Sequence, residues 1–563
     1  MKVFSNHKPI VAILLIFFVS LSFRLYGLNW DQGQHLHPDE RFLTMVTNDI
    51  SLPTSLAQYF NTSLSPLNPY NYAQYQFFVY GTFPLFLTKF IAVNFKFDNY
   101  QHLVFVGRFL SALFDSLNIF LLYLLSRKLT KNKFVYFPSL LYTFCVLPLQ
   151  LSHFFAVDTF LTTFILATFT LLVYNIFPLA AVTFGLALAC KISAIYFLPI
   201  IILFLLQKYQ KNKNIFFLLL ITTFCLLITF LVFHIFQPYA FNGLFRINPH
   251  FIDSIKTLQL YSRPDGNFPP AVQWLSKTPL LFSLQNIVFW GLGLPIFIVF
   301  VISLFKTKFL KVSPFINFAL IWLLLIYFYQ GSQFAHSMRY FLPIYPFICL
   351  LVGIYLSKIK PKVGFIFLII QIFIAIGFIS IYSRPHSRVQ ASSWIYQNIP
   401  INSVLASEYW DDGLPLNLGG NNSNLYKQIT LYPYDPDSSE KIETLLSQTN
   451  SADYLIMSSN RLWASIPQVP KLYPLTTKYY QDLFAEKLNF KKLIEINSYP
   501  GFTLPFLNKC YYFGPTNFPG IKNQWFTADD QCLYPGIYLR DDTAEEAFSV
   551  YDHPKVLIFQ KQK

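Results

Sequence analysis

Residues 362–382 read KVGFIFLIIQIFIAIGFISIY, an apolar run long enough to cross the hydrocarbon core of a membrane as an α-helix. The composition changes directly after this run. Residues 384–563 carry polar and charged side chains at the frequency of an ordinary soluble domain, whereas residues 10–382 consist largely of further apolar runs. The sequence therefore predicts two parts: a polytopic α-helical membrane module over residues 1–383 and a soluble α/β domain over residues 384–563.

The charge of the chain points to a membrane rather than to nucleic acid. Only 12% of the 563 residues are charged, against roughly 25% in soluble proteins, and the net charge is +15. No Walker loop or dinucleotide-binding glycine motif occurs, so nucleotide-driven chemistry is not expected. A nucleic-acid partner is not expected either, because the Lys and Arg residues are placed as membrane topology requires. The basic residues fall in short clusters between apolar runs: Arg127/Lys128/Lys131/Lys133, Lys208/Lys211/Lys213, Lys306/Lys308/Lys311 and Lys358/Lys360/Lys362.

These clusters predict the topology, because short loops rich in Lys and Arg stay in the cytoplasm. All four clusters can lie in the cytoplasm together with Lys2 and Lys8 only if one apolar run before residue 127 does not cross the membrane. The best candidate is residues 76–94, whose glycine, proline and lysine favour a juxtamembrane or re-entrant helix. About 11 spans remain, which predicts a multi-pass protein of the cell (inner or plasma) membrane with a cytoplasmic amino terminus and an extracytoplasmic C-terminal domain. The predicted spans are 10–28, 102–126, 134–151, 157–175, 178–190, 192–207, 214–236, 283–305, 313–330, 340–357 and 362–382.

The ends of the chain agree with this topology. The first apolar run lacks a small-residue cleavage site, so we interpret it as a span rather than as a cleaved signal. Cys510 and Cys532 lie in the polar tail and can form a disulfide if that tail is extracytoplasmic.

The first outer loop, residues 29–101, contains the acidic pair Asp39-Glu40, which follows His37-Pro38. A carboxylate near a membrane surface can serve as general base for an acceptor hydroxyl or amine. Carboxylates and an imidazole can also hold a divalent metal (Mg²⁺, Mn²⁺ or Zn²⁺), with Asp39, His37 and Asp158 as the candidate ligands. The alternative is an acidic pair that only stabilises the start of a helix after the proline.

A second acidic position follows in the next outer turn, where His153 precedes Asp158 at the start of an apolar run. A carboxylate there suits the positive end of a helix dipole. The functional interpretation is that His153 and Asp158 face the first loop's carboxylates, since ionisable residues at membrane depth usually line a cavity.

Three cations complete the candidate site. Lys191 interrupts otherwise apolar sequence, Arg339 stands at an outer boundary beside Tyr340, and Arg108 lies just inside a span. A phosphate at the outer leaflet would need such partners, with Arg as a bidentate donor and Lys as a point charge. The alternative is that these side chains extend to the lipid headgroups.

These residues together resemble the C-type superfamily of membrane glycosyltransferases (GT-C). More narrowly, they resemble the branch that holds protein O-mannosyltransferases and the lipid A aminoarabinose transferase (families 39 and 83). The resemblance covers about residues 10–382. It rests on Asp39-Glu40, Arg108-Phe-Leu-Ser-Ala-Leu, Asp158, a Gly-x-Ala-x-Ala-x-Lys pattern ending at Lys191, and Arg339-Tyr340-x-Leu342-Pro343.

The resemblance implies a hexosyl- or pentosyltransferase that moves a sugar from a polyprenyl-phosphate donor to a protein, lipid or glycan acceptor with inversion. It implies that Asp39 is the catalytic base with Glu40 beside it, and that Asp158 helps to bind acceptor or metal. The carrier phosphate would be neutralised by Lys191, Arg108 and Arg339. The substrate-binding residues would also include His153 and Tyr340. The sequence lacks an obvious central lumenal sugar-binding domain, which separates it from true protein O-mannosyltransferases.

Two other functions remain open at this point. A transporter or flippase for a lipid-linked envelope intermediate would show paired repeats and broken helices in both halves, and no such symmetry is evident in the sequence. An envelope scaffold would use the carboxylates only as helix caps.

Overall fold

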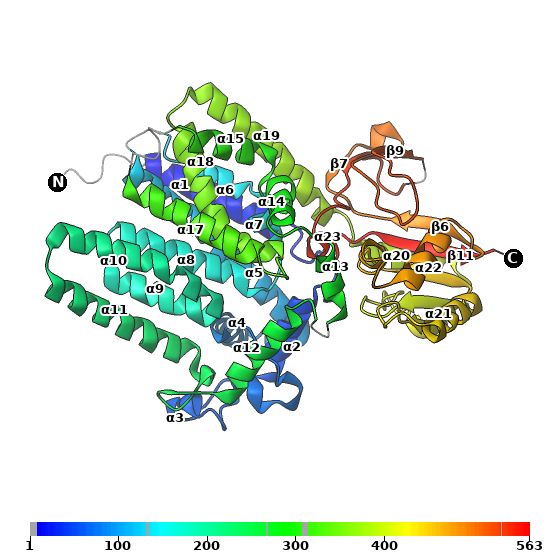
Figure 1. Ribbon diagram of the computed structural model, residues 1–563, viewed down its shortest axis with the longest axis horizontal. Helices are drawn as coiled ribbons and strands as arrows, with labels where there is room; N and C mark the ends of the chain where they lie inside the picture. The colour runs from blue at the N-terminus through cyan, green and yellow to red at the C-terminus, as the bar shows by residue number, and fades with distance from the viewer. Residues whose placement is uncertain (1–7, 131–133, 266–267, 307–312, 531, 563) are drawn as a thin grey trace. The chain divides into compact units, whose positions relative to one another are not determined.

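The computed structural model describes residues 8–130, 134–265, 268–306, 313–530 and 532–562 (Figure 1). Lys2, Lys131, Lys133, Lys308 and Lys311 of the predicted basic clusters lie outside the described residues. The chain forms two compact units. Unit 1 comprises Met1–Leu28, Asp39–Leu260 and Ser283–Ala375, and unit 2 comprises Asn29–Pro38, Tyr261–Phe282 and Ile376–Lys563.

Apolar helices make up most of unit 1. In the described part of the chain, six are long and apolar enough to cross a membrane: Tyr100–Leu129, Ile192–Lys211, Ile215–Phe236, Pro314–Gly331, Met338–Leu356 and the run that starts at Lys362. They correspond to α5 (Tyr100–Leu129), η3 with α10 (Ile192–Phe197, Leu198–Asn212), α11 (Ile215–Phe236), α17 (Pro314–Gly331), η7 with α18 (Met338–Ile344, Tyr345–Leu356) and α19 (Pro361–Ile379). Shorter apolar helices are α1 (Lys8–Leu25), α4 (Thr82–Phe95), α8 (Val157–Val173) and α9 (Phe177–Cys190).

The prediction of a polytopic helical membrane protein is confirmed by these helices. The number of spans stays a prediction. Helix α4, which covers most of the segment predicted not to cross, has 14 residues, but so does α9, and a full crossing takes about 20.

Two predicted spans are not single straight helices. The run 283–305 is divided into α14 (Leu281–Asn286), the π-helix η6 (Ile287–Leu292) and α15 (Leu294–Leu304), with a bend of 117°. The bend follows from Gly293, whose φ of 85° is a conformation that other residues rarely adopt. The run 134–151 becomes α6 (Phe137–Thr143) and α7 (Val146–Leu151). Pro148 explains that break, because a proline is tolerated in the first turn of a helix but not in its interior.

The helices of unit 1 pack as a bundle. Helix α8 contacts α5 and α9, and α9 also contacts α11, so these helices run side by side (Figure 1). Helix α5 packs on α1 and α6, and α18 packs on α6 and α15. The first loop adds α2 (Pro38–Asp49), α3 (Leu56–Phe60), η1 (Pro69–Asn71) and η2 (Ala73–Tyr75), which share an aromatic-rich core with α4. The segment that follows α11 contains η4 (Pro238–Ala240), the strands β1 (Phe241–Asn242) and β2 (Arg246–Ile247), and α12 (Pro249–Tyr261).

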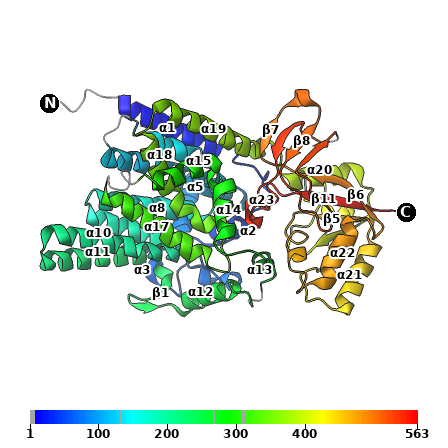
Figure 2. The same cartoon turned by 45° about the horizontal axis from the view of Figure 1, so that its top comes forward.

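Unit 2 is built around a five-stranded mixed sheet with helices on both faces (Figure 2). The strand order is β4-β3-β5-β11-β6, with β3 parallel to β4 and β5, and β11 antiparallel to β5 and β6. One core contains α20 residues, and the other contains residues of α21 and α22. This three-layer arrangement confirms the predicted C-terminal domain with a sheet. The elements are α20 (Ser387–Asn398), β3 (Val404–Glu408), β4 (Lys427–Leu431), α21 (Ser439–Ser451), β5 (Tyr454–Met457), α22 (Pro474–Phe484), β6 (Phe490–Ile496), α23 (Glu546–Ser549) and β11 (Val556–Lys561).

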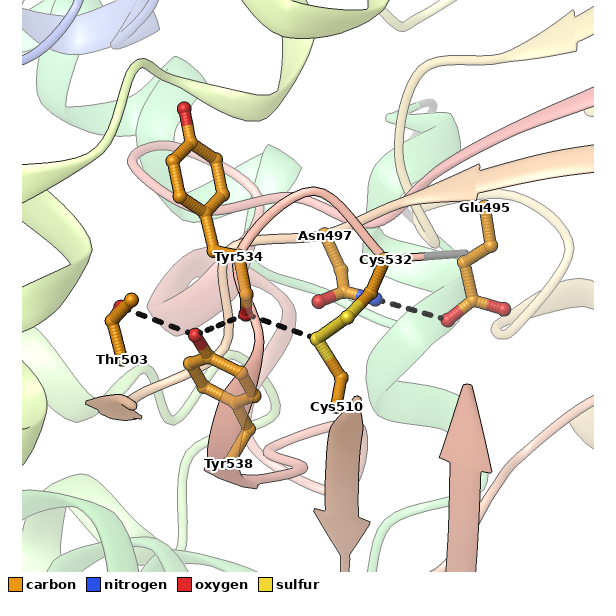
Figure 3. The surroundings of a disulfide bond; sticks show 7 residues. All are labelled: Glu495, Asn497, Thr503, Cys510, Cys532, Tyr534 and Tyr538. Carbon is orange, nitrogen blue, oxygen red and sulfur yellow. Dashed lines mark hydrogen bonds between the residues drawn. A yellow bond between two sulfur atoms is a disulfide. The ribbon is translucent and has the colours of Figure 1, made fainter. Parts of the chain in front are cut away.

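A second sheet in unit 2 has the order β7-β10-β8-β9. Its strands are β7 (Gly501–Thr503), β8 (Cys510–Phe513), β9 (Phe526–Asp529) and β10 (Gly536–Leu539). Cys510, the first residue of β8, forms a disulfide with Cys532, as the sequence allowed (Figure 3). The bond therefore fixes the start of β8 to the chain that leads into β10.

Candidate active site

The carboxylates and cations singled out in the sequence form three ion pairs in unit 1. Glu40 pairs with Arg108, Asp158 with Lys191, and Asp39 with Arg339. The residues come from the first loop, three helices and the segment before α18. The structure thus brings together residues separated by up to 300 positions in the chain.

Glu40 and Arg108 form a buried, bidentate pair. Arg108 donates from Nη2 and Nε to the two oxygens of Glu40, at 2.5 and 3.0 Å, and both side chains are fully buried. The Glu40 carboxylate also accepts a hydrogen bond from the backbone N–H of Phe155 at 2.6 Å. Gly107 lets α5 approach that turn, since a Cβ there would lie 2.2 Å from the Phe155 ring. Each charge is neutralised, and the pair ties the start of α2 to α5 and to the turn before α8.

His153 also joins segments of unit 1. Its Nδ1 lies 2.7 Å from the carbonyl of Leu149, and its Nε2 lies 2.9 Å from the carbonyl of Tyr26. The imidazole is fully buried. It therefore links the turn before α8 to the chain that follows α1 through backbone carbonyls.

Asp158 and Lys191 meet at the ends of neighbouring helices. Asp158 lies in the first turn of α8, where the helix dipole favours a negative charge, and Lys191 follows the last residue of α9. Lys191 Nζ donates to Asp158 at 2.8 Å. Gly81, just before α4, closes this corner: its N–H donates to the Cys190 carbonyl at 3.0 Å, and a Cβ there would lie 2.0 Å from the Ala189 oxygen.

Asp39 and Arg339 form the third pair. Asp39 lies in the first turn of α2, whose first residue is Pro38, so the sequence-based interpretation as a helix start is also satisfied. Arg339 donates from Nη1 to its carboxylate. Tyr340 connects this pair to the second one. Its ring centroid is 5.4 Å from Cζ of Arg339 and 4.7 Å from Nζ of Lys191, so the two cations lie no farther apart than the sum of those distances.

Exposure separates the three pairs into two kinds. The Arg108 and Glu40 side chains are 0% exposed, whereas Arg339 and Asp39 are 27% and 23% exposed and Lys191 is 22% exposed. A ligand can therefore reach Asp39, Arg339 and Lys191 directly. The Glu40–Arg108 pair is closed to solvent and fixes the first turn of α2, where Asp39 lies.

The predicted metal ligands do not form a cluster. Asp39 and Asp158 each accept a hydrogen bond from a different cation. His37 belongs to unit 2, where its ring lies 4.4 Å from the Tyr551 ring. Among the described residues, no three His, Cys, Asp or Glu side chains are grouped so that they could hold a metal ion. A divalent-metal site at Asp39, His37 and Asp158 therefore stays a prediction.

Two ionic groups were missed by the sequence analysis. Arg24 Nε donates to Asp115 at 2.6 Å, with both side chains fully buried between α1 and α5, and Tyr142 donates to the same carboxylate at 2.5 Å. Both charges interrupt apolar runs, which was the available signal. In unit 2, His553 lies between Asp541, 2.6 Å from Nε2, and Asp552. Burial lowers the pKa of His553, but these two carboxylates raise it further, to about 10.

Residues 95–234 match the family of dolichyl-phosphate-mannose-protein mannosyltransferases. The match includes Arg108, His153, Asp158 and Lys191 and does not extend to Asp39 or Arg339. No protein of curated function matches the chain in sequence.

Solved structures share the fold. The apo oligosaccharyltransferase of Archaeoglobus fulgidus superposes with a TM-score of 0.52 and 13% identity, over 85% of this chain and 73% of that one. The archaeal oligosaccharyltransferase AglB from Archaeoglobus fulgidus, in complex with an inhibitory peptide and a dolichol-phosphate, gives 0.51 and 14% over 84% and 73%. ArnT from Cupriavidus metallidurans bound to undecaprenyl phosphate gives 0.46 and 12% over 70% and 73%, too low a score to argue from. The match over residues 95–234 and the fold shared with the oligosaccharyltransferase agree with the predicted class, a multi-pass membrane glycosyltransferase of the GT-C type.

Proposed function

We propose that the chain transfers a sugar from a polyprenyl-phosphate donor to an acceptor on the extracytoplasmic face of a cell membrane, by one inverting displacement. The observation that carries the proposal concerns two ion pairs, Asp39–Arg339 and Asp158–Lys191. Their cations are partly exposed and contact the same Tyr340 ring. Such a site offers a carboxylate for a proton and two cations for a phosphate.

Asp39 is the proposed catalytic base. The acceptor hydroxyl or amine attacks the anomeric carbon while its proton passes to the Asp39 carboxylate. The bond between that carbon and the phosphate oxygen breaks, and its electron pair leaves with the polyprenyl phosphate. A positioned base of this kind contributes roughly 10²- to 10⁴-fold to the rate.

Arg339 and Lys191 are the proposed partners of the leaving phosphate. Negative charge grows on the phosphate as the bond breaks, and fixed cations stabilise that charge without reorganising. Arg339 suits a bidentate contact and Lys191 a point contact. Tyr340 holds the two cations near each other through its ring.

The remaining predicted site residues have positioning roles in this proposal. Asp158 orients Lys191 through their hydrogen bond. Glu40 and Arg108 are buried against each other, so they fix the first turn of α2, from which Asp39 projects. His153 anchors the turn that supplies the Phe155 N–H to Glu40.

The donor class follows from the chemistry and is supported by the comparisons. A phosphate on a polyprenyl chain can approach a site at the end of membrane helices from the lipid, and one of the structures with this fold holds a dolichol-phosphate. We extend this donor class to the present chain.

The extracytoplasmic location is also part of the proposal. The Cys510–Cys532 disulfide is typical of an oxidising compartment, and the distribution of Lys and Arg predicts the same side for the C-terminal domain. A divalent metal at this site would need ligands in addition to Asp39 and Asp158, each of which accepts a hydrogen bond from a cation in this structure. Activity after chelation and after addition of Mg²⁺, Mn²⁺ or Zn²⁺ measures that requirement directly.

The test is to incubate the purified protein in lipid nanodiscs with polyprenyl-phosphate sugars labelled in the sugar. We expect release of polyprenyl phosphate together with loss of label from the lipid fraction. A transporter or flippase would move the lipid-linked sugar between leaflets and leave the sugar–phosphate bond intact. Intact donor across a panel of sugars and acceptors would therefore overturn the proposal.

A further inference from the structure

The four-stranded sheet of unit 2 has one face made of apolar side chains. In the register of the strands, Ile537 of β10 is opposite Phe502 of β7 and Tyr511 of β8. Two positions along, Leu539 is opposite Phe513, which in turn is opposite Phe526 of β9. Residues directly opposite one another point to the same face of a sheet. The face therefore runs without a polar interruption through these six residues across all four strands.

This apolar face is exposed to solvent. Five of its members are exposed rather than buried. The segments between the strands carry two more exposed aromatic side chains: Trp525, directly before β9, is 70% exposed, and Phe506, between β7 and β8, is 76% exposed. The exposed members of the face are Phe502, Phe513, Phe526, Ile537 and Leu539. Single exposed apolar residues are normal on proteins, but a contiguous group of this size indicates an interaction surface.

The opposite face of the same sheet is closed by specific contacts. Cys510, Tyr512 and Tyr538 are buried there with Tyr499. Figure 3 shows Tyr538 donating to the carbonyl of Tyr534, which also lies 3.0 Å from Sγ of Cys510. The disulfide and these bonds hold the sheet together. The exposure of the apolar face therefore does not come from a hydrophobic core that has opened.

The sheet is attached to the end of a membrane helix. The last turn of α19, residues 376–379, belongs to unit 2. The Phe502 ring lies against Gly377 of that turn, at 3.5 Å from the position of a Cβ on the glycine. Arg384, just after the helix, donates to the Tyr499 carbonyl at 2.7 Å, and its Cζ lies 4.9 Å from the Tyr538 ring. Phe502 of the apolar face and Tyr538 of the opposite face thus both contact the segment in which the apolar run of α19 ends.

That attachment sets the depth of the sheet. An apolar helix of this length ends at the boundary between hydrocarbon and headgroups, so β7 lies at that boundary. Phe502 points toward α19, and the other members of the apolar face point in the same direction as Phe502. Tryptophan and other aromatic side chains are favoured at this level of a bilayer.

We propose that this apolar face, together with the exposed Trp525 and Phe506 of the segments between its strands, rests in the interfacial layer of the lipid leaflet from which α19 emerges. The occupant is the bilayer surface, because the face is continuous with a helix whose own exposed residues are lipid-facing. The sheet then acts as a monotopic anchor for unit 2. The inference is independent of the transfer reaction and holds whether or not the chain cleaves a polyprenyl-phosphate sugar.

The experiment uses the full chain in nanodiscs with lipids brominated in the upper acyl chain, which quench tryptophan only on contact with lipid. The emission of Trp525 is obtained as the difference between the wild type and Trp525→Phe, a change that leaves the fold intact because the side chain is exposed. The matched control is Trp410→Phe, since Trp410 is a 37% exposed indole elsewhere in unit 2. We expect brominated lipid to quench the Trp525 difference emission strongly and the Trp410 difference emission weakly.

Two results would overturn the proposal. If Trp525 is quenched by aqueous iodide and not by brominated lipid, the face is exposed to water. If it is protected from both quenchers, and the protection disappears when the protein is diluted in excess lipid, a second copy of the chain covers the face. As a second variant, Phe526→Ser should reduce the quenching of Trp525 by brominated lipid while thermal unfolding shows unit 2 still folded.

Discussion

Arg339 donates a hydrogen bond from Nη1 to the carboxylate of Asp39, 300 residues earlier in the chain. The neighbouring carboxylate, Glu40, pairs instead with Arg108 of α5. Adjacent acidic residues thus bind cations from different elements, and only the Asp39–Arg339 pair is partly exposed. In the proposed mechanism, Asp39 therefore takes part in the chemistry and Glu40 positions it.

The Glu40–Arg108 pair predicts a stability effect that depends on charge balance. Glu40→Met should lower the stability of unit 1 by about 3–5 kcal/mol, because it leaves a buried guanidinium without its carboxylate. The double variant Glu40→Met/Arg108→Met should recover most of the loss. Thermal unfolding in the same lipid or detergent measures both. A double variant no more stable than the single one would show that the two side chains do not act as a pair.

The cations that meet at Tyr340 predict an effect on turnover. Arg339→Met and Lys191→Met should each lower kcat by about 10²- to 10³-fold, as expected for the loss of a donor that stabilises developing charge. Arg339→Lys should retain part of the rate. Lys89→Met is the matched control, since Lys89 is a nearly buried cation of unit 1 that pairs with Asp98 outside the site. Equal losses of kcat in the control and in the site variants would contradict the assignment.

His553 predicts the pH dependence of unit 2. Asp552 and Asp541 raise its pKa from an ordinary 6.5 to about 10, although burial alone would lower it. The folded state therefore holds a proton that the unfolded state loses, so the stabilisation is complete below pH 6.5 and is lost as the pH rises through about 10. Thermal unfolding of the wild type should shift to lower temperature over this range, with a smaller shift for His553→Gln. Identical slopes would mean that His553 is neutral in the folded protein.

Glu408 should also make unit 2 less stable as the pH rises, over a lower pH range than His553. Burial, and to a lesser degree Asp411, raises its pKa from 4.5 to about 8. Its contribution is present below pH 4.5 and is lost as the pH rises through 8, so the residual slope of His553→Gln should lie mainly below pH 8.

A shared site requires that Asp39 and Asp158 be reached from one side of the membrane. Single cysteines introduced at positions 39 and 158, in a chain whose free cysteines are replaced, should react with an impermeant maleimide added outside cells. A cysteine at Lys208, in a predicted cytoplasmic cluster, should react only after the cells are opened. Labelling of positions 39 and 158 from opposite sides would exclude a common reaction centre.

The general architecture could be predicted from the sequence because it depends on composition. The apolar runs of span length and the polar segment after residue 383 are recognised from hydropathy averaged over many residues. Such an average changes little when one residue departs from the pattern. The breaks at Gly293 and before Pro148 were not predicted, because each depends on one residue whose backbone preference overrides an apolar pattern.

The candidate site could be predicted only as a set of residues. Charges in apolar surroundings identified Asp39, Asp158 and Lys191, but spacing along the chain gave no means of assigning partners 33 to 300 positions apart. The difference between the buried Glu40 and the partly exposed Asp39 is likewise a property of packing. The Arg24–Asp115 pair could not be predicted either, because its members lie 91 positions apart in the chain.

The central claim is that Asp39 removes the acceptor proton during transfer from a polyprenyl-phosphate donor. Its most direct measurement is a single-turnover assay of the wild type and of Asp39→Asn, with donor binding measured separately. The account predicts that the wild type cleaves the sugar–phosphate bond and that Asp39→Asn binds donor but is slower by about 10²- to 10⁴-fold. Full activity in correctly folded Asp39→Asn would contradict it.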